Sequence, residues 1–113
     1  MSEKSSEKSS EKFPAVGHRY LVDFKAFRVE LDFASETSMT YYNLDQNGQR
    51  VGQETVTIAV EPIRDGLFLV TWTESDKTTV VHLEDYRDNR IITNITDPSS
   101  GLSKFEGDMT EIA

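Results

Sequence analysis

The stretch FRVELDF, residues 27–33, decides the fold class because apolar and charged side chains alternate along it without a break. A strand points successive side chains to opposite faces, whereas a helix repeats about every 3.6 residues. The stretch therefore predicts a β-strand with one face buried and the other in water.

The same two-residue period recurs on both sides of this stretch and predicts eight strands in all. Turn sequences such as Asn47-Gly48 and Asp65-Gly66 separate them and favour tight hairpins. No segment has a convincing helical pattern. The expected strands span residues 20–24, 27–33, 40–44, 56–60 (ended by Pro62), 67–74, 78–84, 91–96 and 103–112.

Eight strands with short connections predict an all-β, antiparallel up-and-down barrel in one domain, residues 13–113. With no helix to cover a flat sheet, closure removes the sheet edges and buries one face. A two-sheet sandwich would have much the same strand pattern and is the alternative. The interior of an eight-stranded barrel is either nearly filled by side chains or holds one small ligand.

Residues 1–12 repeat a Ser-Glu-Lys unit and have no apolar residue after the initiator Met. Such a segment has nothing to bury against the entropy of ordering, so it predicts a disordered tail. It also lacks the apolar run of a signal peptide, and we therefore expect a cytoplasmic protein.

Composition argues against several classes of function. The net charge of −8 belongs to residues 13–113, because the three Lys and three Glu of the tail cancel. An acidic domain is unsuited to nucleic acid or anionic membranes, and no apolar run reaches the roughly 20 residues of a membrane span. Two His and no Cys argue against zinc, so we expect no metal and no cofactor. A homodimer is left open.

The loop at residues 75–77 decides where Glu74 and His82 point. A three-residue loop pairs Glu74 with Thr78 and puts His82 on the same face as Trp72. A loop of two or four residues would send His82 outside. In the first register the backbones of Glu74 and His82 are more than about 10 Å apart, so the two do not form an obvious catalytic dyad.

The chain resembles the MoaF-like family over residues 13–112, through the ordered segments VGHRYLVDF, FRVELDF, IRDGLFLVTWTE, TTVVHLEDY and TNIT. The resemblance implies a lipocalin-like (calycin-type) eight-stranded barrel. It implies little about activity.

A more distant resemblance is to phenolic acid decarboxylases, through Gly17, Gly52 and the segments DGLF, residues 65–68, and TWTE, residues 71–74. It implies that Glu74 is a proton donor, and it favours the three-residue loop with His82 inside. Val22 and Phe24 stand where those enzymes have tyrosines, and Gln53 stands near their arginine. Those tyrosines and that arginine hold the substrate carboxylate, so we do not expect decarboxylation of phenolic acids.

The predicted pocket combines an acid, an imidazole and aromatic walls. Glu74 is either a lumenal acid with a raised pKa or a rim carboxylate bonded to loop amides. His82 is either a ligand-binding group or proton shuttle, or a satisfied core histidine. Trp72 is a core residue or the wall of an aromatic site. We expect Glu74 and His82 as catalytic residues and, as ligand contacts, Tyr20, Val22, Phe24, Leu31, Phe33, Phe68, Val70 and Trp72.

Glu84, Asp85 and Asp88 are interpreted as an acidic cluster near a turn, without the spacing of a calcium loop.

Three functions fit these residues. The first is binding of a neutral or weakly polar, ring-bearing small molecule, because no Lys or Arg is assigned to the lumen. The second is an enzyme of isomerase, lyase or cyclase type with Glu74 as general acid or base. The third is a filled barrel whose acidic exterior binds a partner.

Overall fold

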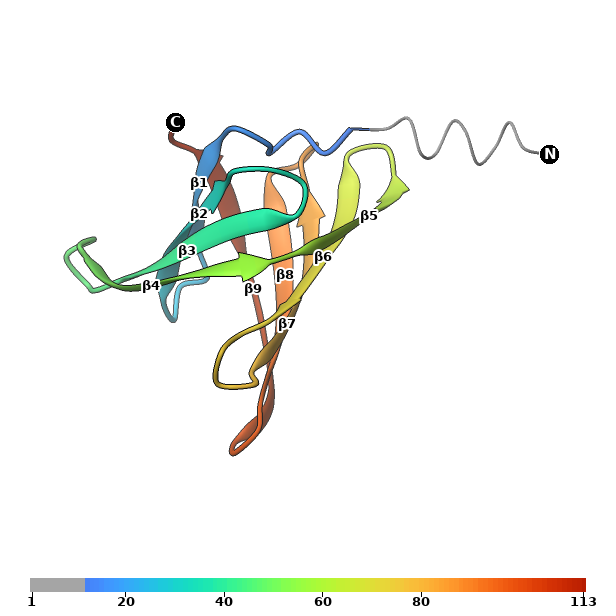
Figure 1. Ribbon diagram of the computed structural model, residues 1–113. Coiled ribbons are helices and arrows are strands. Elements are labelled where there is room, and N and C mark those ends of the chain that lie inside the picture. Colours follow the sequence, from blue (N-terminus) through green and yellow to red (C-terminus); the bar gives the residue numbers. More distant parts are fainter. Residues whose placement is uncertain (1–11) are drawn as a thin grey trace.

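The computed structural model describes residues 12–113, and its secondary structure is entirely β (Figure 1). The expected tail, residues 1–12, lies outside the described residues except for Lys12, which is exposed. The strands are β1 Arg19–Asp23, β2 Arg28–Phe33, β3 Ser38–Leu44, β4 Arg50–Thr57, β5 Ala59–Arg64, β6 Leu67–Thr73, β7 Thr79–Asp85, β8 Arg90–Asp97 and β9 Gly101–Glu111.

All nine strands form one antiparallel sheet with the order β4-β3-β2-β1-β9-β8-β7-β6-β5. Neighbours in the sheet are neighbours in the chain, apart from β1, which also pairs with β9. The sheet curls round, with β4 running on into β5, and the long β8–β9 hairpin extends beyond the rest (Figure 1). The expected all-β antiparallel barrel is confirmed.

The strand count differs from eight because the expected fourth strand is divided at Ile58. The Ile58 N–H still bonds to the Thr37 carbonyl, 2.9 Å away, next to the β3–β4 ladder. The following residue, Ala59, pairs with Thr71 of β6 instead. The chain changes partner at this point, and one bent segment thus joins the two edges of the sheet.

β5 also continues through Pro62, where the sequence predicted that the strand would stop. Pro62 pairs with Phe68, and the register shifts immediately afterwards. Proline has no N–H to donate and is therefore tolerated on an edge strand or at a bulge. Both conditions hold here.

The β6–β7 hairpin has the three-residue loop. The Glu74 N–H donates to the Thr78 carbonyl at 2.7 Å, and Lys77 has a φ of 76°. A left-handed third residue is typical of three-residue hairpin loops. Val70 therefore pairs with His82, and Trp72 pairs with Val80, which confirms the predicted register.

The interior of the sheet has two different halves. In one half, aromatic rings pack edge to face at centroid distances of 5.2–6.2 Å; the rings are those of Phe13, Tyr20, Phe33, Phe68 and Tyr86. In the other half, smaller side chains such as Val29, Val80 and Thr93 face inward. The difference in side-chain volume leaves a cavity there.

No helix in residues 12–113 is long and apolar enough to cross a membrane.

Candidate functional site

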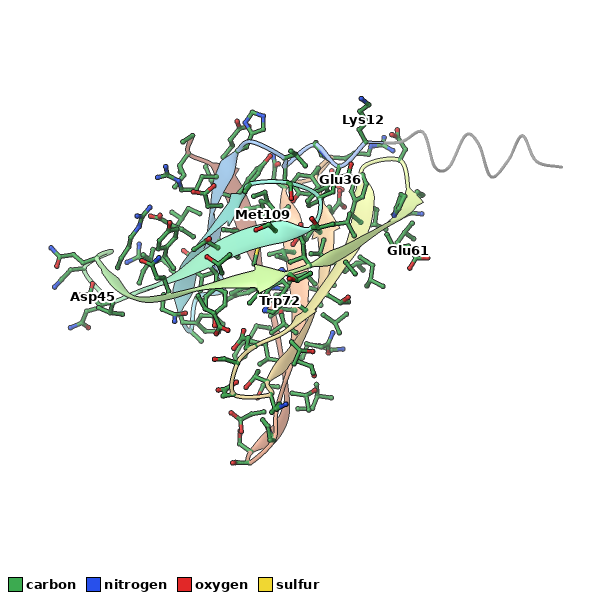
Figure 2. The ribbon with its side chains drawn as sticks, in the orientation of Figure 1. Lys12, Glu36, Asp45, Glu61, Trp72 and Met109 are labelled. Carbon is green, nitrogen blue, oxygen red and sulfur yellow. The ribbon has the colours of Figure 1, made fainter. Side chains whose placement is uncertain are left out.

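The cavity in the open half of the barrel has a volume of about 190 Å³. Trp72, near the middle of the curled sheet in Figure 2, forms part of its wall. Alternate residues of five strands, with residues from the β1–β2 and β6–β7 turns, complete the lining. The lining residues are Phe24, Phe27, Val29, Leu31, Tyr41, Asn43, Trp72, Glu74, Val80, His82, Thr93 and Ile95.

A wider depression of about 570 Å³ lies beside Phe27, between the β1–β2 turn and the β3–β4 hairpin. Its lining includes Asp23, Lys25, Arg28 and Asp45, and Asp45 marks the hairpin tip in Figure 2. Charged, solvent-exposed walls offer little desolvated contact to a ligand. The smaller, more apolar cavity is therefore the better candidate site.

Glu74 lies at the rim of this cavity. The Trp72 indole N–H donates to its Oε2 at 3.1 Å. Partial burial raises the pKa of the Glu74 carboxyl, although the hydrogen bond from Trp72 and the polar hydroxyl of Tyr41 act in the opposite direction. The carboxyl lies at the rim with a raised pKa, and its described donor is the Trp72 indole rather than a loop amide; its role stays a prediction.

Tyr41 connects Glu74 to a second carboxylate. Its hydroxyl donates to Glu54 Oε1 at 3.1 Å, and Glu54 Oε2 accepts the Ser75 N–H at 2.9 Å. Burial, followed by the charge of Glu74, raises the pKa of the Tyr41 hydroxyl. The phenol therefore remains a hydrogen-bond donor at neutral pH, and it binds the carboxylate of Glu54, which holds the loop after β6 against β4.

His82 does not pair with Glu74; its partner is Glu84, two residues along β7. His82 Nδ1 lies 2.9 Å from Glu84 Oε2, and Glu84 is completely buried. The Tyr86 hydroxyl donates to the other carboxylate oxygen at 2.6 Å. Burial raises the pKa of Tyr86, and the charge of Glu84 raises it further.

These contacts correct the interpretation of the acidic cluster. Asp85 remains at the turn, where its Oδ1 accepts the Asp88 N–H at 3.1 Å. Glu84 instead points inward, because residues of the same parity on β7 share a face. Two donors on its carboxylate compensate for the loss of water.

A model of the MoaF-like family matches residues 16–110. The chain belongs to the MoaF-like family. No curated protein matches this MoaF-like protein.

Among similar solved structures is that of a Burkholderia vietnamiensis protein described as a "putative beta-lactamase". The TM-score is 0.81 at 19% sequence identity, over 91% of this chain and 100% of the other. At that identity the likeness shows the fold alone.

Only some of the expected site residues of the MoaF-like protein line the cavity. Phe24, Leu31 and Trp72 line the cavity, together with Glu74 and His82. The remaining expected ligand contacts are buried in the core outside the cavity lining: Tyr20, Val22, Phe33, Phe68 and Val70. The roles of all these residues in ligand binding or catalysis stay predictions.

Sequence reasoning missed Thr93 and the role of Glu84. Thr93 has the same strand parity as Ile91 and Ile95, so a hydroxyl between two apolar residues was the available signal. Glu84 has the parity of His82, but its charged neighbours made a solvated position the simpler interpretation.

Proposed function

We propose that this MoaF-like protein binds a small, neutral or weakly polar molecule in the cavity of the barrel. The observation that carries the proposal is the cavity itself, about 190 Å³ in an interior that side chains could otherwise fill. Apolar cavities of roughly 150 Å³ accept benzene. The volume therefore suits a molecule of about one ring.

The walls support a flat, uncharged ligand. Trp72 and His82 pack edge to face with centroids 4.7 Å apart, and the Tyr41 ring stacks with the indole at a centroid distance of 6.4 Å. No Lys or Arg is among the described lining residues, whereas Glu74 contributes negative charge at the rim. An anionic ligand would lose its hydration without gaining a cationic partner.

The proposal is tested first by identifying a bound molecule, and then by a variant in which a larger side chain fills the cavity. Native mass spectrometry of protein purified from its source identifies a bound molecule by its mass. Trp72 is the only tryptophan, so its fluorescence reports occupancy of the cavity during titration with neutral single-ring compounds.

Val80→Phe and Val81→Phe form a matched pair of variants. Val80 is 4% exposed and lines the cavity, whereas Val81, on the opposite face of β7, is 37% exposed. We expect Val80→Phe to abolish the fluorescence response and Val81→Phe to retain it. A response that survives in Val80→Phe, or no response to any neutral ring, contradicts the proposal and favours a barrel that acts only through its exterior.

Acid–base catalysis on the same ligand is a second candidate, because Glu74 lines the cavity and its pKa is raised by burial. A proton-transfer enzyme exchanges a carbon-bound hydrogen of its substrate with solvent. Proton NMR of the captured ligand in D₂O would show loss of that signal with the wild-type protein and retention with Glu74→Gln. Equal rates for the two proteins would exclude Glu74 from this role.

A further inference from the structure

Two polar atoms on adjacent strands of the cavity wall have no partner among the described residues. Thr93 is fully buried, and its hydroxyl makes no hydrogen bond. His82 binds Glu84 through Nδ1, and its other ring nitrogen, Nε2, has no hydrogen bond to a described residue. Of these two atoms only the Thr93 hydroxyl is fully buried, whereas Nε2 keeps some exposed surface. A buried polar group without a partner costs about 1–3 kcal/mol, so the Thr93 hydroxyl calls for an explanation.

The two groups are direct neighbours. His82 of β7 pairs with Thr93 of β8, and both line the cavity. Residues directly opposite each other on antiparallel strands have Cβ atoms about 4.5–5.5 Å apart. One oxygen atom of a ligand can therefore contact both side chains.

The buried contacts of His82 set which hydrogen-bonding role Nε2 presents. Tyr86 donates to one oxygen of Glu84, and an ionised carboxylate can only accept. Against an ionised Glu84, Nδ1 of His82 is the donor of this pair. In that tautomer of the neutral imidazole, Nε2 is an acceptor on a residue that lines the cavity.

We propose that the cavity selects a single-ring ligand by a hydroxyl group on the ring, an inference that rests on the proposed binding function. The ligand hydroxyl donates to His82 Nε2 and accepts from the Thr93 hydroxyl. Both unpartnered atoms are satisfied by one ligand group. A methyl group satisfies neither atom, and an ether oxygen can only accept.

Three fluorinated rings separate these cases: 4-fluorophenol, 4-fluorotoluene and 4-fluoroanisole. Fluorine NMR titration of the full chain with each compound gives three dissociation constants without relying on protein fluorescence. We expect 4-fluorophenol to bind at least about fivefold more tightly than the other two, the ratio typical of one or two net hydrogen bonds.

Substitutions at Thr93 and His82 test whether each side chain contacts the hydroxyl group of the ligand. Thr93→Val removes only the hydroxyl and should weaken 4-fluorophenol binding about fivefold, with 4-fluorotoluene binding unchanged within twofold. Thr96→Val is the matched control, because Thr96 is an exposed threonine on the same strand.

His82→Asn removes Nε2 while an amide N–H can still reach Glu84, and it should have the same selective effect. His18→Asn is its control at the surface pair with Glu111.

The wild-type comparison decides the outcome even if a variant fails to fold. If 4-fluorotoluene or 4-fluoroanisole binds as tightly as 4-fluorophenol, selection by the hydroxyl is wrong while cavity binding stands. If none of the three rings binds, both the selection and the binding function for single-ring compounds are contradicted.

Discussion

His82 Nδ1 lies 2.9 Å from Glu84 Oε2 in the barrel interior, where the histidine is 4% exposed and the glutamate is not exposed at all. The contact fixes the orientation of the imidazole, which also lines the cavity. Because Tyr86 holds the second carboxylate oxygen, the position of Glu84 does not depend on a ligand. The histidine is therefore oriented before anything binds.

Replacing Glu84 by leucine should destabilise the protein. The change keeps a similar volume but leaves the Tyr86 hydroxyl and His82 Nδ1 without partners in a buried site. We expect the free energy of unfolding to fall by about 2–4 kcal/mol, measured by urea denaturation. The same change at the exposed Glu106 should alter it by less than about 0.5 kcal/mol. Equal small losses at both positions would contradict the structural role of the buried contacts.

Glu74 should titrate above its ordinary value of 4.5, because partial burial disfavours its charged form. Carbon-13 NMR of the side-chain carboxyl measures the pKa directly. Tyr41→Phe removes a polar hydroxyl whose presence lowers this pKa, so the Glu74 pKa in that variant should rise further. An unchanged or lower value in Tyr41→Phe would show that the tyrosine does not stabilise the carboxylate.

The same raised pKa predicts the direction of pH dependence. A carboxyl whose pKa is higher in the folded state favours folding most fully below the unfolded value, and this contribution is lost as pH rises through the folded pKa. The free energy of unfolding of wild type relative to Glu74→Gln should therefore decrease as pH rises above 4.5. Denaturation of both proteins across that pH range measures the difference between their free energies of unfolding. An increase in this difference with pH would contradict the prediction.

Lys77→Gly should stabilise the β6–β7 hairpin. Lys77 has a φ of 76°, a left-handed conformation that costs a residue with a Cβ about 1–2 kcal/mol and costs glycine almost nothing. Part of that gain is offset by the greater freedom of glycine in the unfolded chain, so the net increase should be about 0.5–1 kcal/mol. Lys104→Gly, within β9, should instead lower stability. A loss at both positions would argue against the three-residue loop.

The protein should not decarboxylate hydroxycinnamic acids. Of the positions that would hold the substrate carboxylate, Val22 is fully buried in the core and Phe24 is apolar, while Gln53 is exposed on β4. No described cation lines the cavity. Incubation with coumaric or ferulic acid should release no more carbon dioxide than a Glu74→Gln control. Release above that control would place a carboxylate site somewhere in the barrel.

The sequence alone determined the period of two and hence which side chains share a face. Alternation in FRVELDF and its neighbouring segments depends only on backbone geometry, so local pattern was sufficient. The common orientation of Trp72 and His82 depended in addition on the loop after Glu74. There the usual glycine signal was absent, because a lysine occupies the left-handed position. Only the paired strands settled the register.

Tertiary structure decided which part of the interior is open. The alternation along a strand shows that a side chain points into the barrel, but not how far along the barrel it lies. The volume of a cavity depends on which inward side chains meet across the barrel. Phe33 and Phe68 meet Phe13 and fill one half, while Val29, Val80 and Thr93 leave the other half open. The burial of Glu84 was also decided only by the tertiary structure. Its charge predicts exposure, and only the donors of His82 and Tyr86 make its burial stable.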